Sequence, residues 1–177
     1  MTEFARAMTL AEAKRQTSPL LLIADEAERT ALATRFALPA IDRLEARIEI
    51  AVDGERIRLT GEVSGNAVQS CVATGKPVPA QVRAPLDITL VPEGQAGDTE
   101  EIELGSADLD VETYPAGGRF DPAEIVAETF ALALDPWPRS DDAEAFLKAK
   151  GVLSEEEAGS FGALAGLRER LSKQQPE

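Results

Sequence analysis

Apolar and polar residues alternate along three stretches in the middle of the chain, residues 44–52, 57–71 and 78–90. A period of two is typical of a half-buried β-strand, because successive side chains point to opposite faces of a sheet. Each stretch therefore predicts a strand with one face toward the core. In the third stretch the apolar positions are Val78, Ala80, Val82, Ala84, Leu86, Ile88 and Leu90.

The first two stretches are separated by Asp53-Gly54, a dipeptide favoured in two-residue hairpin turns. With this dipeptide at the centre of the turn, Val52 faces Glu55. The register then pairs small or apolar residues on one face, namely Ile50 with Ile57, Ile48 with Leu59, Ala46 with Gly61 and Leu44 with Val63. It also places Arg58 opposite Glu49, which predicts a cross-strand ion pair. Downstream, Thr74-Gly75-Lys76-Pro77 turns the chain into the third strand.

Two helices are predicted from their first residues. Asp25 followed by Glu28 is a capping box, and the helix it starts ends near Leu38, before Pro39.

The second helix starts at Asp121, with Pro122 as its first residue and Glu124 placed to complete another capping box. An apolar stripe along 125–134 predicts that this helix packs against the sheet. Asp135-Pro136-Trp137-Pro138 ends it.

Weaker patterns predict shorter elements along the rest of the chain: an edge strand in 4–10, a polar loop over 11–18, a buried strand over 20–24, a glycine-rich acidic loop over 92–99, strands at 101–104 and 109–111, and an amphipathic helix over 161–171. Together these elements predict an α+β fold. We expect an antiparallel, strongly twisted or barrel-like sheet of five to seven strands, with two packed helices and a C-terminal helical tail.

Two segments resemble the YceD family, the large ribosomal RNA subunit accumulation proteins. They are Gln69–Pro79 and Glu124–Arg139, and the similarity extends in order to 28–36, 41–46 and 161–167. The resemblance is to the alphaproteobacterial branch of that family. It implies a domain of YceD type over residues 1–139, followed by an acidic linker and amphipathic helix over 140–177. It also implies a role in normal accumulation of large-subunit rRNA, with no known enzymatic activity.

The chain carries 32 acidic and 18 basic residues, a net charge of −14. Nucleic-acid affinity comes largely from lysine and arginine, so a phosphate backbone repels such a surface. If the protein acts in ribosome assembly, this favours a basic ribosomal protein or assembly factor as partner, with direct contact to precursor rRNA as an alternative. Acidity that simply keeps the protein soluble is compatible with either. No signal-like or membrane-spanning run is present, so we expect a cytoplasmic protein with no membrane or DNA partner.

Catalytic groups are scarce. With no histidine and a single cysteine, Cys71, neither a Cys-His pair nor a four-ligand zinc site can form, and Thr74 stands where some family members have a second cysteine. Gly75-Lys76 is no phosphate loop, because Ser70 and Pro77 replace the required residues. We therefore expect a non-enzyme without cofactor or metal. The alternative is a hydrolase using two carboxylates, which would need them to converge in a deep pocket.

The candidate binding residues are Gln69, Cys71, Thr74, Lys76, Pro77, Trp137 and Arg139. For Cys71 itself we favour a packed core position over a nucleophile or ligand. Trp137 has two interpretations. It is either a plug over the sheet edge or an indole held rigidly by its flanking prolines, in a form suited to a binding hot spot.

Overall fold

The computed structural model describes residues 4–93, 111–115 and 118–152. These residues form an α+β fold, as predicted. The four helices of the described part are α1 (Leu10–Ala13), α2 (Glu26–Arg35), α3 (Pro122–Leu132) and α4 (Ala143–Ala149). Its strands are β1 (Met8–Thr9), β2 (Leu20–Ile23), β3 (Ala40–Asp53), β4 (Arg56–Ser70), β5 (Pro77–Pro92), β6 (Val111–Tyr114) and β7 (Arg119–Phe120).

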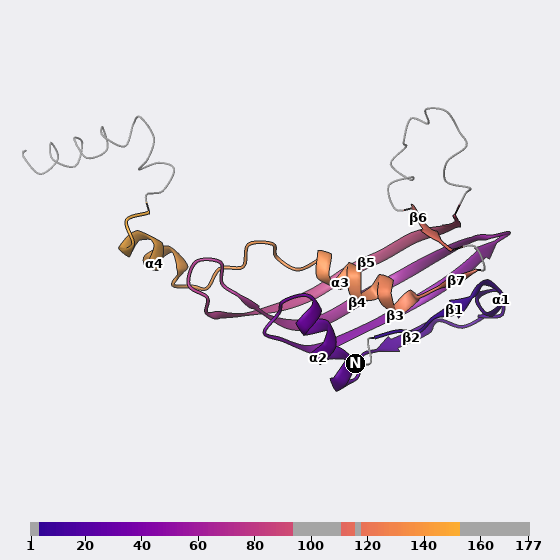
Figure 1. Cartoon of the computed structure of the whole chain (residues 1–177), viewed down its shortest axis with the longest axis horizontal. Coiled ribbons are helices and arrows are strands. Elements are labelled where there is room, and N and C mark those ends of the chain that lie inside the picture. The colour runs from indigo at the N-terminus through magenta and orange to yellow at the C-terminus, as the bar shows by residue number, and fades with distance from the viewer. Residues whose placement is uncertain (1–3, 94–110, 116–117, 153–177) are drawn as a thin grey trace, which may run out of the picture.

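A five-stranded sheet of order β2-β3-β4-β5-β6 is the centre of the fold (Figure 1). Its three long strands, β3 to β5, are consecutive antiparallel neighbours and confirm the strands predicted from the alternating pattern. Helices α2 and α3 pack on one face of this sheet. At one end of the long strands lies α4, and at the other end lie β1, β7 and α1 (Figure 1).

The alternating residues of β3, β4 and β5 determine which face the helices cover. Leu44, Leu59 and Leu86 are buried under them, together with Phe130 of α3. Gly65 of β4 allows this close packing, because a Cβ there would lie 2.7 Å from the Phe130 ring. The opposite face of the sheet carries mainly polar and charged residues.

The β3–β4 hairpin exists, but its predicted register was wrong by two residues. Val52 pairs with Ile57 and not with Glu55, and the remaining pairs are Ile50–Leu59, Ile48–Gly61, Ala46–Val63 and Leu44–Gly65. The two central residues of the turn are Gly54 and Glu55, not Asp53-Gly54. Gly54 has a φ of 62°, which suits the first central position of a tight hairpin turn. Glu49 consequently faces Thr60, and Arg58 forms its ion pair with Asp87 of β5.

Three features of the predicted sheet were also wrong. The sheet is open and not barrel-like, since its two edge strands, β2 and β6, do not pair with each other. Strand β6 runs parallel to β5, which the long connection after Pro92 permits. Strand β2 is not a buried strand, because it lies at the edge and exposes Leu21 by 62% and Ile23 by 54%.

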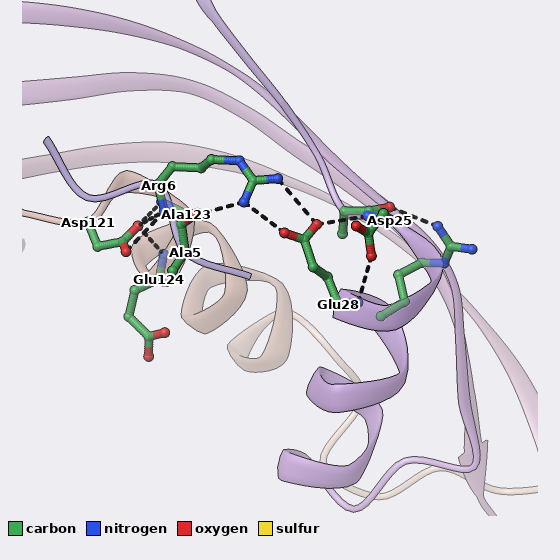
Figure 2. A network of polar contacts seen from close by, with 9 residues as sticks. Ala5, Arg6, Asp25, Glu28, Asp121, Ala123 and Glu124 are labelled. Atoms are coloured by element: carbon green, nitrogen blue, oxygen red, sulfur yellow. Dashed lines mark hydrogen bonds and ion pairs between the residues drawn. The ribbon is translucent and has the colours of Figure 1, made fainter. Parts of the chain in front are cut away.

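A polar network joins the N-terminal segment to the first turns of α2 and α3 (Figure 2). The Arg6 side chain donates to both carboxylate oxygens of Glu28, at 2.7 and 3.3 Å, and its backbone N–H donates to Asp121 at 2.9 Å. Glu28 is 3% exposed, and it also completes the predicted capping box with Asp25. The N-terminal segment around Arg6 is thus bonded to the first turns of both helices.

The predicted capping box of α3 is half formed. Asp121 accepts from the backbone N–H groups of Ala123 and Glu124, as an N-cap should. The Glu124 carboxylate, however, pairs with Arg35 at the end of α2. The reciprocal half of the box is therefore replaced by a bridge between the two helices.

The shorter predicted elements fit in part. The edge strand predicted in 4–10 is limited to β1, the loop over 11–18 begins as α1, and α2 ends at Arg35. Strand β6 begins at Val111, where the strand predicted at 109–111 ends. The strand at 101–104, most of the acidic loop and the amphipathic helix over 161–171 lie outside the described residues. The described part of the predicted linker contains α4, and the division at residue 139 remains a prediction.

Candidate functional site

The β4–β5 hairpin ends in a closed turn that holds most of the candidate residues. Strand β4 stops after Ser70, and the Cys71 N–H donates to the Lys76 carbonyl at 2.8 Å. The Gly75 N–H donates back to the Cys71 carbonyl at 2.9 Å, and Gly75 has a φ of 71°. These two bonds close the backbone of the turn.

The chain that follows α3 lies over this turn and is bonded to it. The Val72 N–H donates to the Pro138 carbonyl at 2.9 Å, and the Gln69 side-chain amide donates to the Asp135 carbonyl at 2.8 Å. Lys76 forms an ion pair with Asp142. We call the two bonded segments, Gln69–Pro77 and Asp135–Asp142, the hairpin-tip surface.

Cys71 is the buried centre of the hairpin-tip surface. Its Sγ, in a residue 3% exposed, accepts from the Ser140 N–H and the Ser140 hydroxyl at 3.3 Å each, and from the Thr74 N–H at 3.4 Å. Burial raises the pKa of the Cys71 thiol, but the hydrogen bonds from Ser140 and Thr74 outweigh it and lower the pKa to about 6. The hydrogen bonds therefore favour the anionic form of the sulfur, while the burial of Cys71 leaves it little access to solvent.

Trp137 is the largest exposed side chain of the hairpin-tip surface. It is 71% exposed, and the neighbouring Val72 is 51% exposed. The backbone N–H of Trp137 donates to the Asp135 carboxylate at 2.9 Å. The next residue along the chain, Pro138, is buried. The exposure of Trp137 excludes the plug over the sheet edge. The remaining interpretation is an exposed indole on a backbone that hydrogen bonds hold in place.

The structure separates the seven candidate residues into two groups. Gln69, Cys71 and Thr74 are buried or half-buried and hold the two segments together. The exposed group, which a partner can reach, consists of Lys76, Pro77, Trp137 and Arg139.

Sequence reasoning missed Ser140 and Asp142, which bond to Cys71 and Lys76 across more than 60 residues of chain. No local pattern marks them.

The basic residues of the sheet do not form a free positive patch. On the face away from α2 and α3, Arg43 pairs with Glu45, Arg58 with Asp87, and Arg83 with Glu62. Two further arginines of that face have acids opposite them in the register, Arg47 opposite Glu62 and Arg56 opposite Asp53. Each arginine therefore has a carboxylate neighbour that competes with any phosphate.

Neither a cluster of metal-binding side chains nor a membrane-spanning helix occurs within the described residues. No group of three or more histidine, cysteine or acidic side chains there is arranged to hold a metal ion. None of the helices in that part of the chain has both the length and the apolar character needed to cross a membrane.

The structure is thus an α+β domain with one face of its sheet covered by helices, and with an exposed tryptophan at the hairpin tip. The family described as large ribosomal RNA subunit accumulation protein YceD matches residues 59–168, more than half of the chain. The chain belongs to this family, which confirms the resemblance seen in the sequence. The family's description names accumulation of the large-subunit rRNA, a process and not a reaction. No curated protein and no solved structure matches the chain.

Proposed function

We propose that this protein is a non-catalytic binding protein of the cytoplasm that assists accumulation of large-subunit rRNA during ribosome assembly. Its partner is a basic ribosomal protein or a ribosome-assembly factor. Membership of the YceD family supports the process. The net charge of −14 supports a basic protein partner, because it attracts cationic surfaces and repels phosphate.

The observation that carries this proposal is the exposed Trp137 on the braced hairpin-tip surface. The Trp137 backbone is held by its bond to Asp135 and by the bonded Pro138, so its chain segment loses little conformational freedom in a complex. Interface hot spots are enriched in tryptophan. Val72, whose N–H is bonded to the Pro138 carbonyl, is also exposed and adds apolar surface to the hairpin tip. The carboxylates of Asp135 and Asp141, on either side of Trp137 in the chain, suit a partner with lysine or arginine around an apolar pocket.

Direct recognition of precursor rRNA is the second interpretation, and the arginines of the sheet bear on it. Their carboxylate neighbours would have to be displaced before a phosphate could bind. Such pairs neutralise the charge that counterion release requires. The paired arginines therefore favour a protein partner.

The experiment is depletion of the protein in its host, followed by complementation. We expect depletion to lower the ratio of large-subunit to small-subunit rRNA and wild-type protein to restore it. Trp137→Ala should restore it poorly and should recover less basic partner in a pull-down. Leu21→Ala is the matched control, because Leu21 is also an exposed large apolar residue but lies on the edge strand β2.

Two outcomes would count against the proposal. An unchanged rRNA ratio after depletion would remove the role in large-subunit accumulation. Full complementation by Trp137→Ala, with normal partner recovery, would remove the hairpin-tip surface from the mechanism. Melting temperatures of both variants close to that of the wild type would show that folding is not the cause.

A further inference from the structure

A groove with a volume of about 380 Å³ lies between α3 and the edge strand β6. Strand β6 and the start of α3 are at the end of the sheet opposite the hairpin tip (Figure 1). Its floor is apolar and consists of the buried residues Leu90, Tyr114, Phe120 and Ile125. The Tyr114 hydroxyl donates to the Glu55 carbonyl at 2.6 Å, which fixes β6 to the β3–β4 turn. The floor of the groove is therefore part of the folded core.

Carboxylates line the rim of this groove. Glu124 and Glu128 are one helical turn apart and project from the same side of α3, and Glu112 of β6 also lines the groove. Burial raises the pKa of Glu128, and the negative charges of Glu124 and Glu112 raise it further. Arg35 pairs with Glu124 from the α2 side, and Arg119 is the basic residue of the lining. The rim of this apolar groove is therefore rich in negative charge.

The combination of an apolar floor and an acidic rim matches the side chains of lysine and arginine. Their methylene stems pack on apolar surface while the cationic head stays among polar groups. A cation at the mouth would also relieve the mutual repulsion of Glu112, Glu124 and Glu128. A phosphate or a carboxylate ligand would meet the same charges and be repelled.

We propose that the groove between α3 and β6 binds a lysine- or arginine-bearing segment of a partner protein. This inference rests on the proposed function, since it locates where a basic partner makes a second contact. The hairpin tip and the groove lie at opposite ends of the long strands, with Pro77 of β5 at one end and Pro92 at the other. A partner that reaches both sites would span the length of the sheet.

The test uses the full-length protein and a labelled peptide that alternates lysine and leucine. Glu112→Gln combined with Glu128→Gln keeps the side-chain shapes and removes two charges from the rim. We expect the affinity for the peptide to fall about tenfold, which corresponds to one lost charge contact of about 1.4 kcal/mol. Because the variant relieves repulsion, its melting temperature should equal or exceed that of the wild type, so misfolding would not mimic the result.

The control variant is Glu49→Gln combined with Glu144→Gln. It removes the same net charge from exposed positions on β3 and α4, outside the groove. We expect less than about a twofold loss of affinity, since exposed charges separated from the bound ligand are screened by salt. An equal loss in the two variants would show general electrostatic attraction and would overturn the groove as a site, as would an unchanged affinity of the Glu112 and Glu128 variant.

The two proposals fail in different ways. If depletion leaves the rRNA ratio unchanged, the proposed function fails, but the peptide assay still reports on the groove. If the Glu112 and Glu128 variant binds peptide normally while Trp137→Ala loses partner recovery, the groove inference fails and the proposed function stands.

Discussion

The sulfur of Cys71 shows how one residue connects two distant segments of this protein. It accepts from Thr74 within its own turn and from Ser140 in the chain after α3. Hydrogen bonds to sulfur are weak individually, but burial makes an unpaired donor costly. Cys71 therefore combines the packing role expected from the sequence with a polar role that the sequence did not indicate.

Replacement of Cys71 distinguishes these roles. Cys71→Val keeps an apolar side chain but leaves the Ser140 and Thr74 N–H groups without an acceptor, so we expect a loss of about 2 kcal/mol of unfolding free energy. Cys71→Ser keeps an acceptor and should lose about 1 kcal/mol. Urea unfolding measures both. If the valine variant is at least as stable as the serine variant, the hydrogen bonds to sulfur do not hold the tip together.

At the scale of elements, the N-terminal segment depends on one charged pair. Arg6 donates to Glu28, a nearly buried carboxylate on α2, and the same segment is bonded to the cap of α3 (Figure 2). The hydrogen bond from Arg6 lowers the pKa of Glu28 against the opposing effect of burial. Removing Arg6 would leave that carboxylate without its cationic partner.

This arrangement predicts a loss of stability in acid. Because the pKa of Glu28 is lowered on folding, its contribution is present above the ordinary glutamate pKa of 4.5 and is lost as the pH falls below that value toward the folded-state pKa. Arg6→Gln should cost about 2 kcal/mol near neutral pH, and its stability should decline less steeply below pH 4.5. Thermal unfolding at several pH values measures this. Parallel curves for variant and wild type would contradict the role of the pair.

The β3–β4 hairpin shows which features of an element the sequence predicts and which it does not. Alternation identified both strands and their buried faces, but a period of two cannot distinguish registers that differ by two residues. The turn decides between them, and Gly54 takes the first central position in place of the second. Local signals likewise predicted the caps Asp25 and Asp121, because the capping bonds of each side chain go to backbone N–H groups within three residues of it.

The candidate site was also predictable in part, because its two segments carry local sequence signals. The sequence selected the turn around Cys71 and the segment around Trp137 separately. What it did not contain was their contact, since Ser140 and Asp142 bond to residues 66 to 69 positions earlier. The open sheet and the exposed side chains of β2 also depend on which strand ends at an edge, and that is a property of the whole topology.

At the scale of the whole molecule, the structure has an exposed tryptophan at one end of the long strands and a groove with an acidic rim at the other, on a chain with a net charge of −14. We propose that these features act on different steps of binding. Long-range charge accelerates the encounter with a basic partner, and salt weakens it. A buried aromatic contact acts after the encounter and mainly slows dissociation.

Salt should therefore separate the two contributions. For a purified basic partner, we expect the affinity of the wild-type protein to fall several-fold as ionic strength rises from roughly 0.05 to 0.15 M, because the Debye length shortens to about 8 Å. Trp137→Ala should weaken binding at every salt concentration while leaving the salt dependence unchanged, with the loss appearing in the dissociation rate. The Glu112→Gln and Glu128→Gln variant should instead show a shallower salt dependence. Surface plasmon resonance across a salt series measures both, and identical salt dependence in all three proteins would mean that the charge of the groove does not take part in recognition.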